Sequence, residues 1–238
     1  MRYSIAFAAA ALASSVSAHG VITAVQGANG VTMPGLSVID GTPRDSGNPL
    51  SGSEADTSII RTKEMGGKAS ALGRTQGGGP VDAAAAISTF MGGAGGAAGA
   101  AAGTKRGLLD ALTGGGKAAG GAAGGAAGGA AGTKTAKGTS ESGVAAAAGQ
   151  GASSGLPTTS DDGTITMTFH QVNQDGAGPL TAMIDATSGG TDPAAFQKAT
   201  VTQNVPGIGI GGLSAASSMD FPVKVRSPHP NLILPSPS

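Results

Sequence analysis

The chain has 238 residues, 44 of them glycine, with no cysteine and no net formal charge. Only 12% of the residues are charged and 3% are aromatic, and tryptophan is absent. This composition excludes a disulfide scaffold and an aromatic stacking platform, and it argues against nucleic acid as a partner.

The first 18 residues have the pattern of a secretory signal peptide. Arg2 supplies a positive start, residues 5–13 form a short apolar run, and Val16-Ser17-Ala18 places small residues at a cleavage position. Cleavage after Ala18 makes His19 the new N-terminus. No other apolar run approaches the ~20 residues that cross a membrane. We therefore expect a protein that is secreted, extracellular or cell-wall associated; a buried N-terminal helix or membrane anchor is the alternative.

Residues 19–90 are expected to form the N-terminal arm of a β-rich core. Residues 21–25 are rich in β-branched side chains and residues 36–39 form a second short apolar run, so both segments predict extended structure. Asp56 is a candidate cap for a helix that begins there and ends near Gly66.

Residues 91–155 form a low-complexity segment dominated by alanine and glycine, which repeats Ala-Ala-Gly-Gly over residues 118–132. Neither residue type carries enough apolar surface to offset the entropy of the chain, so we predict a flexible, disordered insert. The alternative is an Ala/Gly helix or a silk-like sheet, with short helices near residues 83–90 and 144–148. Within the insert, Lys105-Arg106 is either a candidate processing site or an ordinary solvated pair.

Residues 156–226 form a C-terminal arm with the clearest strand pattern. Apolar residues alternate with polar ones over residues 164–170, which predicts that Ile165, Met167 and Phe169 face inward and His170 faces outward.

A turn-forming stretch at residues 173–179 precedes a second alternating run at 180–184, so these segments predict a hairpin. Residues 200–205 and 221–225 predict further strands. The fold class is therefore mostly β, with a small β-sandwich-like core interrupted by the insert, and residues 227–238 are expected to form a disordered tail.

Two histidines are candidate metal ligands. After cleavage, His19 would offer its α-amine and its imidazole, and His170 would add a second imidazole. Three nitrogen ligands suit Cu(II). The arrangement resembles the histidine brace of lytic polysaccharide mono-oxygenases, which are secreted β-sandwiches with an N-terminal histidine. The alternative is that His19 only marks the cleavage point and that His170 is a polar surface residue.

The chain offers little for a hydrolase or a nucleotide enzyme. It has no Gly-x-Ser-x-Gly elbow, and Asp161, Asp162 and Asp175 stand at turn positions, where aspartate is common for backbone reasons. Residues 207–212 are glycine-rich but lack the Gly-x-Gly-x-x-Gly spacing. A non-enzymatic surface or matrix protein is therefore the first hypothesis, and the copper site is its alternative.

Six segments occur in the order found in one known family. They are His19-Gly20-Val21-Ile22, residues 40–45, residues 75–82, residues 170–179, Asn204-Val205-Pro206-Gly207 and Asp220-Phe221-Pro222. Together they resemble the fungal Egh-like family of secreted virulence factors, also described as appressorium-associated cell-surface proteins. The resemblance covers the two arms but not the insert. It implies a protein linked to host penetration or development, with cell-wall or host-surface components as partners.

Overall fold

The computed structural model describes residues 19–65, 67–93, 131–176, 178–207 and 217–228. The predicted signal peptide at residues 1–18 lies outside the described residues. So do the Lys105-Arg106 pair, most of the glycine-rich stretch at 207–212 and most of the predicted tail.

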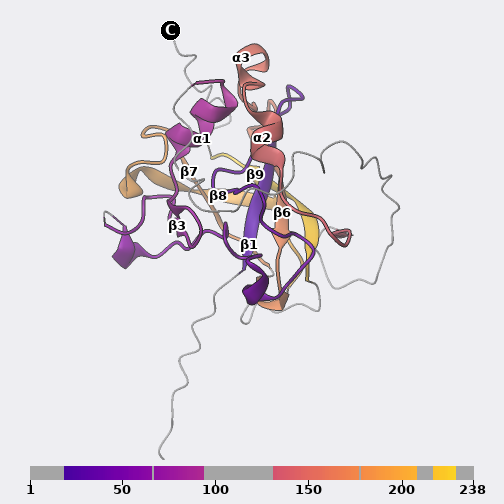
Figure 1. Ribbon diagram of the computed structural model, residues 1–238. Coiled ribbons are helices and arrows are strands. Elements are labelled where there is room, and N and C mark those ends of the chain that lie inside the picture. Colours follow the sequence, from indigo (N-terminus) through magenta and orange to yellow (C-terminus); the bar gives the residue numbers. More distant parts are fainter. Residues whose placement is uncertain (1–18, 66, 94–130, 177, 208–216, 229–238) are drawn as a thin grey trace, which may run out of the picture.

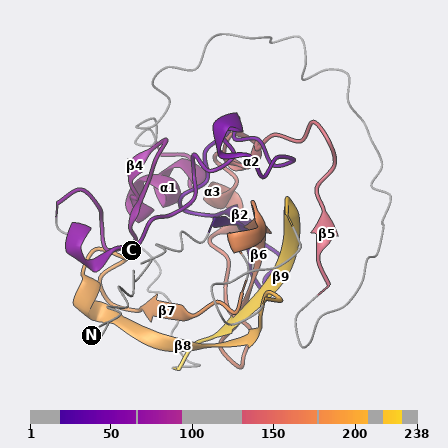
Figure 2. The same ribbon diagram turned by 90° about the horizontal axis from the view of Figure 1, so that it is seen from below.

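Within the described residues, seven strands form one antiparallel sheet with the order β2-β1-β6-β9-β8-β7, and β5 also pairs with β9. The strands are β1 (Gly20–Gln26), β2 (Thr32–Pro34), β5 (Thr133–Lys134), β6 (Thr164–Gln171), β7 (Ala182–Asp185), β8 (Phe196–Gln203) and β9 (Met219–Arg226). The sheet curls from β6 through β9 to β8 and β7 (Figure 2). A separate short ribbon joins β3 (Arg74–Thr75) to β4 (Gly79–Pro80). The mostly-β expectation is confirmed.

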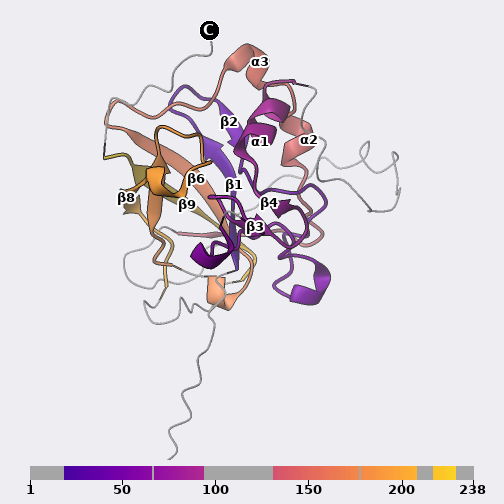
Figure 3. The same cartoon turned by 90° about the vertical axis from the view of Figure 1, so that its left-hand side faces the viewer.

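Three short helices lie together on one side of the sheet (Figures 1 and 3). They are α1 (Ala83–Phe90), α2 (Gly143–Ala147) and α3 (Gly151–Ser154), and single 3-10 turns occur at Pro49–Ser51, Thr62–Glu64, Gln174–Gly176 and Pro193–Ala195. The side chain of Asp82 caps α1 by accepting a hydrogen bond from the backbone N–H of Ala85 at 3.0 Å. Among the described helices, none combines the length and the apolar character that a bilayer crossing requires.

The main hydrophobic core is built from alternate residues of the central strands. Phe169 of β6 and Phe221 of β9 face each other across the sheet register and are 7% and 2% exposed. Partly buried Ile165 and Met167 pack against the same cluster, so the predicted inward face of β6 is confirmed.

The predicted hairpin between β6 and the run at residues 180–184 is wrong. Strand β6 pairs with β1 on one edge and β9 on the other, so both of its edges are occupied. The turn after β6 instead carries the chain to the far edge of the sheet, where β7 pairs with β8.

Residues 131–155 are folded, although their composition predicts a flexible insert. Strand β5 pairs with β9, and Ala147 of α2 is buried in a second apolar cluster with Met33 and Phe90. Small residues are required here, because a Cβ atom on Gly132 would lie only 2.3 Å from the ring of Phe221. Residues 94–130 lie outside the described residues.

Two expectations for the N-terminal arm are also wrong. Leu36 and Ser37 form a turn rather than a strand, with a hydrogen bond from Val38 N–H to Gly35 O at 3.1 Å. No helix begins at Asp56; its carboxylate accepts instead from the backbone N–H of Ile39 and from an arginine. That side chain is part of the site described next.

Candidate functional site

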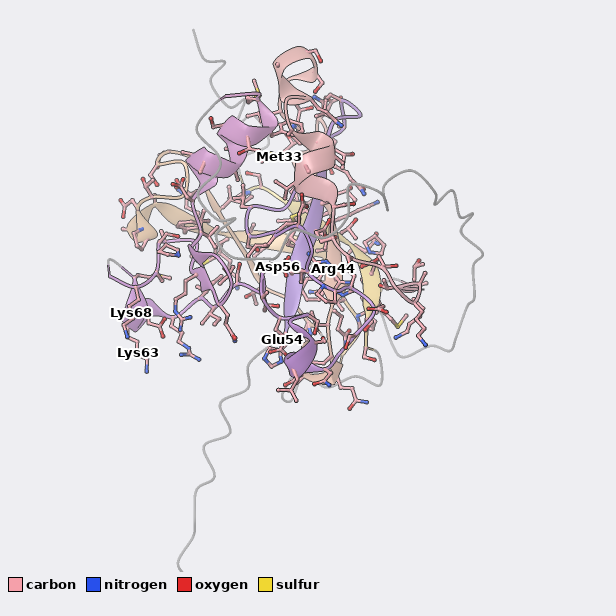
Figure 4. All side chains as sticks on the ribbon, viewed as in Figure 1. Met33, Arg44, Glu54, Asp56, Lys63 and Lys68 are labelled. Atoms are coloured by element: carbon pink, nitrogen blue, oxygen red, sulfur yellow. The ribbon has the colours of Figure 1, made fainter. Side chains whose placement is uncertain are left out.

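A buried ion cluster joins three distant parts of the chain. The guanidinium of Arg44 donates two parallel hydrogen bonds to the carboxylate of Asp56, one of them 2.9 Å long, and a further one of 3.0 Å from Nε to Glu141. The side chains of Arg44 and Asp56 are 5% and 0% exposed. Figure 4 labels the two residues beside each other. Two parallel bonds of this kind fix the orientation of both groups as well as their distance.

The charge state of this cluster follows from its contacts. Burial alone would lower the pKa of Arg44, but the hydrogen bonds and charges of Asp56 and Glu141 outweigh burial and raise it above its ordinary value. The guanidinium therefore stays charged and is held between two carboxylates. It links the N-terminal arm to residues 131–155 through its ion pair with Glu141.

The loop at residues 40–45 explains why the returning segment folds. Asp40 accepts hydrogen bonds from the backbone N–H groups of Val144 and Ala145, at 3.0 and 2.7 Å, and so caps the beginning of α2. Asp45 accepts from the backbone N–H of Gly138 at 2.7 Å. Together with Arg44, these side chains bind residues 138–145 of the Ala/Gly-rich segment. Glycine and alanine side chains could not make such contacts themselves.

A pocket of about 520 Å³ is bordered by β1, β2 and α2, by the residues just after β5, and by Asp220 of β9. Its wall is rich in hydroxyl groups and carries three charged side chains. The residues that line the pocket include Thr23, Arg44, Ser140, Glu141, Ala146 and Asp220. The volume falls within the ~300–1,000 Å³ range of small-ligand sites.

His170 is buried and not on the surface, so its predicted outward exposure is wrong: the residue is 1% exposed. Just after β6, the side-chain amide of Asn173 donates a hydrogen bond of 3.0 Å to Glu54 of the N-terminal arm. The ring Nδ1 of His170 lies 2.7 Å from Oδ1 of Asp220. Since an ionised carboxylate can only accept, Nδ1 is the donor of this bond, and in a neutral ring Nε2 would carry the lone pair.

The Nε2 atom of His170 is buried and has no hydrogen-bond partner among the described residues. Buried polar atoms are nearly always paired with protein, water or an ion, so this atom calls for an explanation. A carboxylate that holds the opposite ring nitrogen is also the usual support of a histidine that binds a metal.

His19 is held by a different set of polar groups. Its Nδ1 lies 3.0 Å from the amide nitrogen of Asn173 and 3.3 Å from Oδ1 of Asp175, and its Nε2 lies 3.4 Å from Oε2 of Glu54. Gly176 packs directly against its backbone: a Cβ atom there would lie 2.1 Å from the carbonyl oxygen of His19.

The structure places the two histidines on the same face of the β1–β6 ladder. His170 is in register with Val21, and the carbonyl of His19 accepts from the N–H of Val172 at 3.0 Å. Residues two apart on a strand share a face, so His19 and His170 are diagonal neighbours, a relation that typically separates Cβ atoms by roughly 7–8 Å. Among the described residues, no group of three or more histidine, aspartate or glutamate side chains is arranged to hold a metal.

Sequence reasoning missed Arg44, Asp56 and Glu141. The usable signal was their scarcity, since a chain with only 12% charged residues has few arginines to leave unexplained. The fold and this site define a strand-rich protein with a hydroxyl-lined pocket beside a curled antiparallel sheet.

Comparison with known proteins assigns the family. The Egh16-like virulence factor family model matches residues 17–231. Over 230 residues, the chain is 59% identical to the appressoria-specific virulence factor GAS2 of Pyricularia oryzae strain 70-15 and to a second Pyricularia oryzae protein of the same name; each match covers 96% of this chain and 77% of the relative. No solved structure matches the chain.

The chain therefore belongs to the Egh16-like virulence factor family. The family resemblance seen in the motifs is confirmed. It extends further than those motifs indicate, because the matched range runs through the low-complexity insert as well as the two arms.

Proposed function

We propose that this protein is exported by a fungus and acts by binding, without catalysis, at the cell wall or the host surface. The observation that carries the binding role is the pocket beside α2, which is lined by hydroxyl groups and in which the guanidinium of Arg44 is already neutralised by its own carboxylates. The likeness to an appressoria-specific virulence factor supports a role in host penetration or development.

Export is tested by fractionating a fungal culture that expresses the chain with a C-terminal tag. We expect the protein in the wall fraction, with His19 as its first residue. The matched control is Ala10→Asp, which places a charge in the apolar run of the signal peptide and should hold the protein inside the cell. Wild-type protein found inside the cell and beginning at Met1 would contradict export.

Binding through the pocket is tested by filling it. Ala146 lies on α2 and lines the pocket, whereas Ala145 is exposed on the same helix and does not line it. In a pull-down with a purified fungal wall fraction, Ala146→Trp should abolish retention and Ala145→Trp should retain it. Circular dichroism checks that both variants fold. Equal retention of the two variants would remove the pocket from the binding role.

A copper-binding protein is the second candidate, and one specific observation favours it. The buried Nε2 of His170 has no hydrogen-bond partner among the described residues, and the ring is oriented by Asp220. If the mature chain begins at His19, that residue adds an α-amine and an imidazole on the same face of the ladder. Imidazole and amine nitrogens suit Cu(II), so His19 and His170 are the residues that would hold it.

A further inference from the structure

A basic loop projects from the side of the molecule away from the pocket. Residues 61–74 contain four of the chain's 14 basic residues and a single acidic one, in a chain with no net charge. Lys63 and Lys68 are both exposed, and their side chains point away from the body of the protein (Figure 4). Within the described part of the chain, neither lysine has an ion pair or a hydrogen-bond partner.

The loop is held in shape by its one acidic side chain and by its backbone. Glu64 accepts hydrogen bonds from Arg74 at 2.6 Å and from Arg61 at 3.1 Å, and these bonds, that of Arg74 first, lower the pKa of its carboxyl group. The backbone N–H of Ala69 bonds the carbonyl of Glu64 at 3.0 Å. Two arginines and two lysines against one carboxylate leave a net charge of +3 on a preorganised loop.

The loop is concave rather than flat. A pocket of about 520 Å³ is lined by Lys63, Glu64, Met65, Gly67, Lys68 and Arg74. Two free ammonium groups therefore flank a hollow that also contains a carboxylate acceptor. A ligand that fits both features carries negative charge and also donates hydrogen bonds from hydroxyl groups.

We propose that Lys63, Glu64 and Lys68 form a site for an acidic polysaccharide whose sugars carry carboxylates. The lysines would contact the carboxylates, and Glu64 would accept from the ring hydroxyls. Each sugar of such a polymer carries both a carboxylate for the lysines and hydroxyl donors for Glu64, a combination that the phosphate groups of a nucleic acid or a lipid do not themselves provide. The inference concerns a surface separate from the pocket near α2 and is tested with purified protein, so it does not depend on export.

The test measures affinity for polygalacturonate, with neutral dextran as the uncharged control. We expect wild-type binding that weakens as ionic strength rises, because exposed charges are screened by salt. Lys63→Gln and Lys68→Gln should each weaken binding about fivefold, and the double variant roughly 25-fold, as for lysines at other anionic surfaces. Neither lysine makes a contact that folding needs, so both variants should unfold at the wild-type temperature.

The matched control is the double variant Lys198→Gln/Lys224→Gln, which removes the same charge from exposed positions on β8 and β9. It should bind like wild type, and so should the pocket variant Ala146→Trp. Equal losses in the two lysine double variants would overturn the proposal, and so would absence of wild-type binding. Binding to phosphatidylserine vesicles without binding to polygalacturonate would also overturn it and would assign the loop to lipid.

Discussion

Arg44→Ala is expected to lower the free energy of unfolding by about 3–5 kcal/mol, the usual cost of removing one partner of a buried ion pair. The variant leaves the carboxylate of Asp56, which is 0% exposed, without its cation, and it also releases Glu141. The loss should appear in urea denaturation as a lower midpoint. Because Glu141 belongs to residues 131–155, those residues should also become more accessible to proteases.

Two further variants separate the ion pair from simple loss of bulk. Lys224→Ala removes an exposed cation from β9 and should leave stability within about 0.5 kcal/mol of wild type. The double variant Arg44→Met/Asp56→Leu removes both charges, and replacement of a whole buried pair by apolar groups is often neutral or stabilising. It should therefore recover most of the loss. An Arg44→Ala protein as stable as wild type would contradict the role assigned to this ion pair.

Copper affinity of the mature chain is expected to fall about 10–100-fold in Asp220→Asn, the range found when the carboxylate behind a metal-binding histidine is removed. The physical reason is that Oδ1 of Asp220 fixes the proton of His170 on Nδ1 and leaves Nε2 free to bind. His170→Ala removes the ligand itself and should cost at least as much. The measurement is a competition titration of Cu(II) against a chelator.

Two controls for the copper titration are the third histidine of the chain and a chain with residues before His19. The remaining histidine, His229, lies outside the described residues, and His229→Ala should leave the affinity unchanged. A chain that begins before His19 should bind weakly, since its α-amine is no longer beside the imidazole. Electron paramagnetic resonance should show one fewer nitrogen ligand in His170→Ala. An unchanged spectrum and affinity in that variant would exclude His170 as a ligand.

Local sequence patterns predicted those strands whose side chains alternate between core and surface. The alternation of Ile165, Met167 and Phe169 specifies which face of β6 meets the core, because that signal is contained in the strand itself. The partner of a strand is a different matter. The hairpin expected after β6 failed because pairing depends on which edges are already occupied, and those edges are taken by β1 and β9, which are far away in the sequence.

The burial of His170 escaped sequence reasoning for a similar reason. Its strand alternates in sequence up to Phe169, but His170 is buried and contacts Asp220 of β9, which lies 50 residues further along the chain, and no local pattern records that contact. The two histidines were identified as candidates from their chemistry, and only the strand register shows that they share a face.

The composition of residues 131–155 gave the least accurate prediction, because it indicated a flexible chain where the structure is folded. Alanine and glycine do not supply enough apolar surface to fold alone, yet residues 131–155 fold because Asp40, Arg44 and Asp45 bind them from outside. The glycines are also used for fit, since Gly132 lies beneath the ring of Phe221 where no larger side chain has room. A low-complexity stretch can thus be ordered by contacts that its own sequence does not reveal.

Strands of the same sheet lie on both sides of residues 94–130 in the sequence, and this matters if the chain is cut there. Strands β1 and β2 precede residues 94–130, whereas β5 to β9 follow them, and β1 pairs with β6 along its length. A single break between residues 94 and 130 would yield two polypeptides that share one sheet and the Arg44–Glu141 ion pair. With no cysteine to cross-link them, we expect the two polypeptides to be held together by noncovalent contacts alone and to separate when the sheet unfolds.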